Sequence, residues 1–239
     1  MAEAALAVEG EALVEAAEGL AVVELREVGD RMNAATFFSS EEQERIQQAV
    51  IAAEKNTSGE IVPMIVTSSA RYTELELFGV VIGLLAGLIV EWFWSDPWGS
   101  EFLNLWPIIG ALIGFLLCRI PAVKRFFTPN SRAVEAVHRL GLASFTEYGL
   151  HYTEAHTGIL ILVSLLEHRV EVFADRGINQ KVAAGTWNDI VALLTAGLKS
   201  GEACDAFCKA IGRCGEILAA HFPRQPDDKD ELPNRLVTR

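Results

Sequence analysis

Two stretches in the middle of the chain, residues 77–94 and 103–118, are almost continuously apolar, and Glu91 is their single charged residue. At 1.5 Å per helical residue, each stretch approaches the roughly 20 residues that cross a bilayer. A surface helix of a soluble protein keeps a polar face, and neither stretch has one. Core helices of a soluble protein are the alternative, because both stretches are somewhat short. The pattern predicts a two-helix transmembrane hairpin over residues 77–120.

Small residues repeat regularly within both apolar stretches. Glycines at every fourth position align on one helix face and let two helix backbones approach closely. Indole rings favour the headgroup region of a bilayer, and tryptophans gather around the connection between the stretches. The residues concerned are Gly79, Gly83, Gly87, Gly110 and Gly114, together with Trp92, Trp94, Trp98 and Trp106.

Charges beside the hairpin predict its orientation, because Lys and Arg near helix ends stay on the cytoplasmic side. The connection, residues 95–104, holds two acids and no base. Arg71 precedes the first helix, and the second helix is followed by Arg119, Lys124, Arg125 and Arg132. We therefore expect both termini in the cytoplasm.

The sequence before the hairpin has the pattern of a helix followed by a strand. A capping-box signature at residues 39–43 predicts a helix that runs to about Lys55. Residues 60–67 are rich in β-branched side chains and predict a strand. Pro63 within it indicates an edge position or a bulge.

The sequence after the hairpin continues the same domain. Helical periodicity predicts a helix over residues 130–148. Residues 157–164 are continuously apolar, as in a strand buried on both faces, and residues 169–175 alternate. The short link between these two strands predicts an antiparallel hairpin. Two further helices are expected over residues 186–199 and 202–221.

The domain organisation follows from these patterns. Residues 37–76 and 128–223 form a split α/β domain, and the hairpin is inserted in it. Residues 1–36 are an acidic leader, with a loose helix and a disordered segment as alternatives. Residues 224–239 are a polar tail.

Charge and cysteine content exclude some functions. The net charge is −12, and the first 30 residues hold eight acids against one arginine. Nucleic acid requires basic patches, so we expect no nucleic-acid partner. Cys204, Cys208 and Cys214 are spaced by four and six residues on one predicted helix, which suits neither a zinc knuckle nor a redox pair. We interpret them as packing residues, with metal binding as the alternative.

A family resemblance rests on short segments spread over the chain: Gly59-Glu-Ile-Val-Pro63, Thr157-Gly-Ile-Leu-Ile161, Glu167-His-Arg-Val-Glu-Val172, Ala174-Asp-Arg-Gly-Ile178, Trp187, Ala220-His-Phe-Pro223 and Glu231-Leu-Pro-Asn234. These segments resemble the TPM domain, and more narrowly its bacterial membrane branch, in which a transmembrane hairpin interrupts the domain. The resemblance covers about residues 37–237. It implies a three-layer α/β/α sandwich with a mixed sheet, in a multi-pass protein of the bacterial inner (plasma) membrane. Members of the family have been linked to phosphatase activity, to calcium binding and to accessory roles beside membrane complexes.

Asp175 is the candidate metal ligand. It ends a strand before a glycine-containing turn, where α/β sheets often hold ligands, and a carboxylate there could bind a hard cation. The alternative is that Asp175 caps the turn through the backbone. Calcium takes six to eight oxygens, and here Thr157, backbone carbonyls and water would have to supply most of them, so we expect weak Ca²⁺ binding. Many family members carry a glycine-rich stretch where this chain has Ala174-Asp175-Arg176.

Other polar residues are weaker candidates. His151 and His156, with Glu154, could form a metal or acid–base site, or a solvated loop. Residues 167–169 are expected to form a polar turn. Asp189 is expected as a first-turn acid stabilised by the helix dipole. The acids of residues 227–231 are either a solvated run or a weak calcium surface.

These observations favour a membrane protein that displays a cytoplasmic TPM-like domain and acts as an accessory or scaffold factor for membrane components. Its partners would be membrane lipids and membrane proteins. A metal-assisted phosphatase using Asp175 is the alternative. The chain contains no phosphate-binding glycine loop, no Gly-x-Ser-x-Gly elbow and no His-Glu-x-x-His, so no catalytic residue can be assigned.

Overall fold

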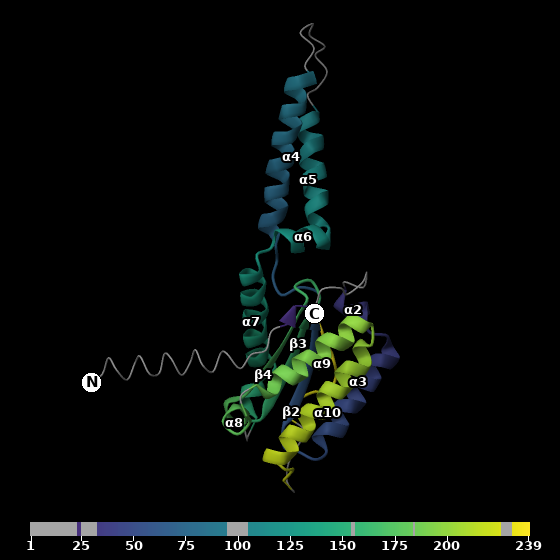
Figure 1. Ribbon diagram of the computed structural model, residues 1–239, viewed down its shortest axis with the longest axis vertical. Coiled ribbons are helices and arrows are strands. Elements are labelled where there is room, and N and C mark those ends of the chain that lie inside the picture. The colour runs from purple at the N-terminus through teal and green to yellow at the C-terminus, as the bar shows by residue number, and fades with distance from the viewer. Residues whose placement is uncertain (1–22, 25–32, 95–104, 154–155, 184, 226–230) are drawn as a thin grey trace, which may run out of the picture. The chain divides into compact units, whose positions relative to one another are not determined.

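The computed structural model describes residues 23–24, 33–94, 105–153, 156–183, 185–225 and 231–239 (Figure 1). The chain divides into two compact units. We call Met1–Ser69 with Val134–Arg239 the sheet unit, and Ala70–Ala133 the hairpin unit. The finer division into leader, split domain, insertion and tail stays a prediction.

A mixed five-stranded sheet forms the centre of the sheet unit, in the order β1-β4-β3-β2-β5. Strand β3 is parallel to β2 and antiparallel to β4, so the predicted β3–β4 hairpin is confirmed. The short β5 runs parallel to β2, and β1 pairs antiparallel with β4. The strands are β1 (Val23–Glu24), β2 (Glu60–Val66), β3 (Gly158–Ser164), β4 (Arg169–Ala174) and β5 (Val237–Thr238).

Pro63 does not bulge β2, contrary to one expectation, because the pairing with β3 runs residue by residue and sets Pro63 opposite Ile161. Strand β2 is also not the outermost strand, since β5 flanks it. The backbones of Ile65 and Thr67 bond to Arg239 on the β5 side. Pro63 faces that same side, just before β5 pairs with Met64. A missing N–H therefore costs no ladder bond there.

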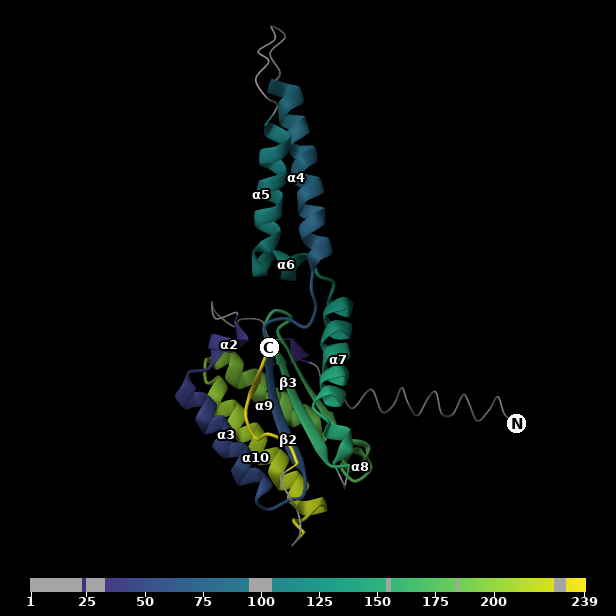
Figure 2. The same ribbon diagram turned by 180° about the vertical axis from the view of Figure 1, so that it is seen from behind.

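Helices cover both faces of the sheet (Figures 1 and 2). On one face, side chains such as Ile61 and Ile161 pack with α3, α9 and α10. On the other face, Leu160 and Leu162 pack with Val137 of α7. Burial on both faces explains the continuous apolar sequence of β3. The helices are α2 (Ala34–Phe37), α3 (Ser40–Glu54), α7 (Asn130–Glu147), η1 (Leu150–Tyr152), α8 (Arg176–Asn179), α9 (Thr186–Ser200) and α10 (Ala203–His221).

Local signals fix the ends of these helices. Ser39 and Glu42 form the predicted capping box at the start of α3: the Ser39 side chain accepts from the Glu42 N–H, and the Glu42 side chain accepts from the Ser39 N–H. Gly201 ends α9 with a left-handed φ of 80°, a conformation that glycine adopts without strain.

The hairpin unit holds α4 (Thr73–Trp94), α5 (Trp106–Arg119) and α6 (Pro121–Phe127). Helix α4 is long and apolar enough to cross a membrane. Helix α5 is shorter than the predicted second span, because the chain bends by 87° into α6 at Pro121. Helices α5 and α6 are long and apolar enough to cross a membrane only when taken together. The loop of residues 95–104, with Trp98, lies outside the described residues.

The glycines of α4 and α5 lie at their contact, as their spacing predicts. A Cβ atom on Gly83 would overlap the Gly110 backbone, and a Cβ atom on Gly110 would overlap the Gly83 backbone. Gly79 and Gly114 meet in the same way. The two helix backbones therefore approach more closely than any side chain would permit.

Candidate functional site

Asp175 lies at the end of β4 and caps α8. Its Oδ1 accepts a hydrogen bond from the Arg176 N–H at 2.6 Å, and its carbonyl accepts from the N–H groups of Ile178 and Asn179. Asn179 in turn donates to the Ala174 carbonyl at 2.9 Å. Asp175 therefore has the capping role that the sequence offered as the alternative to metal binding, and it uses one carboxylate oxygen for this role.

The second oxygen of Asp175 faces a histidine. Oδ2 lies 3.4 Å from Nδ1 of His156, and the His156 side chain is 66% exposed while that of Asp175 is 13% exposed. His156 has a φ of 51°, a left-handed conformation in the loop that precedes β3. The contact therefore joins a mostly exposed imidazole to a mostly buried carboxylate.

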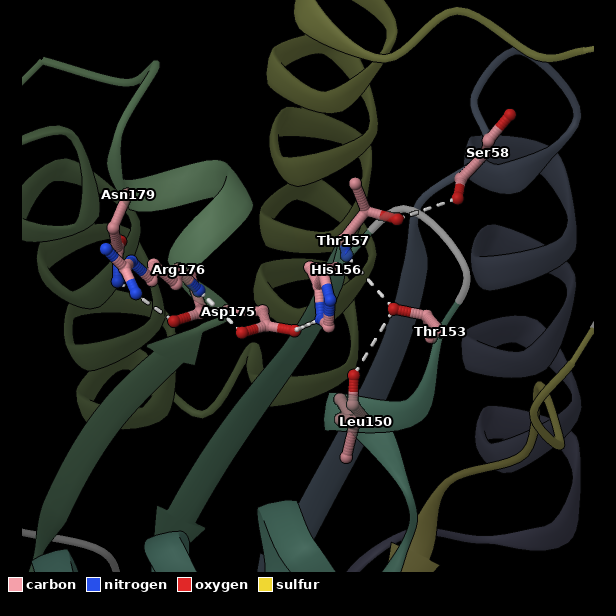
Figure 3. Close-up of polar contacts among 9 residues, drawn as sticks. Ser58, Leu150, Thr153, His156, Thr157, Asp175, Arg176 and Asn179 are labelled. Carbon is pink, nitrogen blue, oxygen red and sulfur yellow. Dashed lines mark hydrogen bonds and ion pairs between the residues drawn. The ribbon is translucent and has the colours of Figure 1, made fainter.

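Thr157 does not join this pair. Its hydroxyl donates to the Ser58 carbonyl at 2.9 Å, and its N–H donates to Thr153 Oγ1. Figure 3 shows the Thr157 hydroxyl directed away from Asp175 and towards Ser58. The threonine predicted as a supplementary ligand thus ties the start of β3 to the loop before β2.

Strand direction places Asp175 at an unexpected end of the sheet. In open α/β sheets, ligands bind beyond the carboxyl ends of parallel strands. Strand β4 is antiparallel to β3, and the Asp175 N–H bonds to the carbonyl of Gly158, the first residue of β3. Asp175 therefore lies at the amino ends of β2 and β3, so the positional argument that favoured it does not hold.

The carboxyl ends of β2 and β3 carry a different polar cluster. The Glu167 carboxylate accepts from the Ser69 N–H at 3.0 and 3.1 Å and from the Ser164 hydroxyl. The Ser69 hydroxyl donates to Ser164 Oγ at 2.9 Å. Glu167, His168 and Arg169 were expected as a polar turn. Glu167 and His168 do lie in the turn, whereas Arg169 is the first residue of β4, and each of the three is at most 6% exposed. Sequence position gave no sign of this burial.

A second acid that sequence reasoning missed lies on β4. Glu171 is almost completely buried and pairs with Nδ1 of His138 on α7 at 2.7 Å. Desolvation raises the pKa of Glu171, partly offset by His138 and Arg169. Alternation along β4 puts Glu171 on the face that α7 covers, and only the position of α7 shows that this face is buried.

The other candidates are dispersed. His151 lies in η1 with its ring against Tyr152, at 3.8 Å between centroids. Asp189 is a first-turn acid of α9, as expected. Glu154 and residues 227, 228 and 230 lie outside the described residues, whereas the N–H of Glu231 donates to Glu60. Across the described part of the chain, no group of three or more His, Cys, Asp or Glu side chains is placed to hold a metal ion.

Two cysteines of α10, Cys204 and Cys214, are buried packing groups, and Cys208 is partly buried. Burial raises the pKa of the Cys214 thiol to about 12 and that of Cys204 to about 11. Such thiols stay protonated at neutral pH and are poor nucleophiles and poor metal ligands. Cys204 and Cys208 point their sulfur atoms at carbonyls of α3.

Comparison with known proteins supports the fold of the chain. No protein-family model matches it, and no curated protein matches it. The chain is similar to the NMR structure of BA42 from the psychrophilic bacterium Bizionia argentinensis, with 22% identity and a TM-score of 0.53 over 85% of this chain and 96% of that one. At this identity the likeness shows a shared mixed α/β fold.

Proposed function

We propose that this chain is an integral protein of the bacterial inner membrane that displays a TPM-like α/β/α sandwich in the cytoplasm and serves as an accessory or scaffold factor for membrane components. In this proposal α4 and α5 cross the membrane as a hairpin, and the protein is multi-pass with both termini inside.

The outer surface of the hairpin is the observation that carries the proposal. Large apolar side chains cover α4 and α5 on the sides away from their contact, and Leu77, Ile89, Ile108 and Leu112 are each more than half exposed. Exposed apolar area costs about 25 cal/mol per Å² in water, and soluble proteins seldom expose more than a few hundred Å² in one patch. A lipid solvent removes this cost.

The charges at the ends of the hairpin support the orientation. Helix α5 ends at Arg119, and α6 holds Lys124 and Arg125, whereas the connection of residues 95–104 has no basic residue. Basic residues are retained on the cytoplasmic side.

The geometry around Asp175 favours a scaffold over an enzyme. A metal-assisted phosphatase needs several oxygen ligands that converge on a cation. Asp175 uses Oδ1 as a helix cap and turns Oδ2 towards His156. The sheet unit also has an open hollow of about 600 Å³ between α3 and α10, lined by Glu44, Arg45 and Gln48 among others, which leaves room for contact with a partner surface.

Membrane extraction and cross-linking test this proposal. The chain should remain in the membrane pellet after alkaline carbonate washing, and release into the wash would contradict a membrane hairpin. A photo-cross-linker at exposed Gln48 should give a discrete adduct with a membrane protein. The same group at Gly212, on an open part of α10, is the control. Equal, diffuse adducts at both positions would contradict the scaffold role.

A weak cation site at Asp175, beside His156, is the second candidate function. With one firm carboxylate, Ca²⁺ should bind with a dissociation constant of roughly 10⁻⁴ to 10⁻³ M and lose this affinity in Asp175→Asn. Calorimetry on the full chain in detergent measures it, with exposed Asp189→Asn as the control. Tight binding that survives Asp175→Asn would move the site elsewhere, and phosphatase activity lost in that variant would favour the enzyme.

A further inference from the structure

An apolar groove runs along the hairpin unit beside the contact of α4 and α5. Its volume is about 620 Å³. Phe78 and Ile82 line it from α4, Ile109 and Ile113 from α5, and Lys124 and Phe127 from α6. The groove exists because the glycines allow the two backbones to approach closely, while the larger side chains beside them project outward and form its sides.

Helix α6 terminates this groove at one end. The chain turns by 87° between α5 and α6. Figures 1 and 2 both show α6 lying across the hairpin at the start of α4 and the end of α5. A transmembrane helix of a partner would have to continue past this end, where α6 lies in its path. An acyl chain begins at the membrane surface and needs no such exit.

The end of the groove at α6 is basic. Lys124 Nζ donates to Glu76 Oε1 at 2.7 Å, and both side chains are mostly buried. An ammonium group carries three donors, so Lys124 keeps donors for a second anionic oxygen. Arg119 and Arg125 lie within five residues of Lys124 in the sequence, and these three bases outnumber the two acids in the first turn of α4, Glu74 and Glu76. A phosphate complements that excess.

We propose that the groove binds an anionic phospholipid, with one acyl chain along the glycine-lined contact and the phosphate at Lys124. This site rests on the proposed membrane location of the hairpin. It differs from general solvation by lipid, because the bound molecule is chosen by its headgroup charge and held by a shaped surface.

Native mass spectrometry of the full chain in mild detergent tests the site. Phosphatidylglycerol and phosphatidylcholine with identical acyl chains are added at equal concentration. The wild type should retain one phosphatidylglycerol in preference to phosphatidylcholine. Lys124→Gln should lose this preference by about tenfold, the size expected for one charge-assisted hydrogen bond. Lys199→Gln, which removes an exposed lysine of α9, should leave it unchanged.

A second variant tests the groove without altering charge. Ala86 lines the groove, so Ala86→Phe fills it and should abolish retention of both lipids. Leu85 faces outward at 52% exposure, and Leu85→Phe should retain lipid as the wild type does. The two variants add an aromatic ring to adjacent residues, which controls for general effects on the helix.

Three results would overturn this site. Equal retention of the two lipids by the wild type, retention that survives Ala86→Phe, or a second copy of the chain bound through the groove would each do so. If the chain is instead washed from membranes by alkaline carbonate, the membrane proposal itself fails. A chain that stays in membranes but shows no lipid preference refutes the lipid site only.

Discussion

The sheet unit and the hairpin unit arrange similar side chains in opposite ways. Phe207 of α10 is completely buried in the sheet unit, and Ile161 lies in the same core. In the hairpin unit Leu88 is 45% exposed and Ile108 is 64% exposed. The first arrangement is stable in water, and the second is stable where the solvent is itself apolar. The contrast is what the proposed membrane location of the hairpin unit requires.

The interiors of the two units differ as well. The sheet unit fills its core with branched and aromatic side chains that interlock, such as Phe38 edge-on to Phe207. The hairpin unit brings Gly83 and Gly110 together instead. Where no hydrophobic driving force acts between helices, close backbone contact supplies the van der Waals energy. Substitutions should therefore have opposite consequences in the two units.

The largest expected effect is loss of a core aromatic side chain. Phe207→Ala should lower the free energy of unfolding of the sheet unit by about 3–5 kcal/mol, because the cavity left behind cannot close fully. Urea titration of the full chain in detergent, followed by hydrogen exchange in α9 and α10, measures this loss. Leu88→Ala on the outer face of α4 should change it by less than about 0.5 kcal/mol. Equal losses would remove the contrast between the units.

A smaller loss is expected at the glycine contact. Gly83→Ala places a methyl group against the Gly110 backbone and should destabilise the pairing of α4 and α5 by about 1–3 kcal/mol. Gly83→Ile should do so more strongly. Disulfide trapping across engineered cysteine pairs on α4 and α5 measures the pairing. Trapping as efficient as in the wild type would count against glycine-mediated contact.

The same substitution should have the opposite sign in the sheet unit. A Cβ atom at Gly212 of α10 meets no atom within 4 Å. Gly212→Ala should therefore stabilise the sheet unit by about 0.5–1 kcal/mol, since alanine loses less backbone entropy in a helix. Thermal unfolding of the two variants side by side gives the comparison. A destabilised Gly212→Ala would mean that this surface is covered.

The smallest effect concerns pH. Because burial raises the pKa of Glu171, its contribution to stability is most favourable below the unfolded pKa and declines as pH rises through the folded pKa. Glu171→Gln stays uncharged, so its free energy of unfolding relative to the wild type should rise as the pH increases above the ordinary pKa of a glutamate. Exposed Glu216→Gln is the control. Parallel pH profiles for Glu171→Gln and the wild type would refute the role of burial.

Local signals in the sequence predicted the elements that depend on neighbouring residues. The capping box at Ser39, the short turn between β3 and β4 and the glycine spacing in α4 each involve residues a few positions apart. Such features need no knowledge of the rest of the fold. The bend between α5 and α6 was missed, although Pro121 at the first position of α6 marked it.

The candidate site depended on contacts that sequence position does not reveal. The antiparallel direction of β4 was predicted, but its consequence for Asp175 needed the parallel pairing of β2 with β3. The burial of Glu167 requires Ser69, almost 100 residues earlier in the chain. Loop residues such as His168 look solvated from composition, whereas tertiary contacts bury them.

The most direct test of a hairpin with both ends in the cytoplasm is labelling of engineered cysteines in intact cells. A membrane-impermeant thiol reagent should label Ser100→Cys in the connection and should leave Ser200→Cys, at the exposed end of α9, unlabelled until the cells are opened. Peptide mass spectrometry reads each site separately from the native cysteines. Protection of Ser100→Cys together with labelling of Ser200→Cys would reverse the orientation. The membrane hairpin itself would be contradicted if both positions stayed protected until the cells were opened and the chain was soluble afterwards.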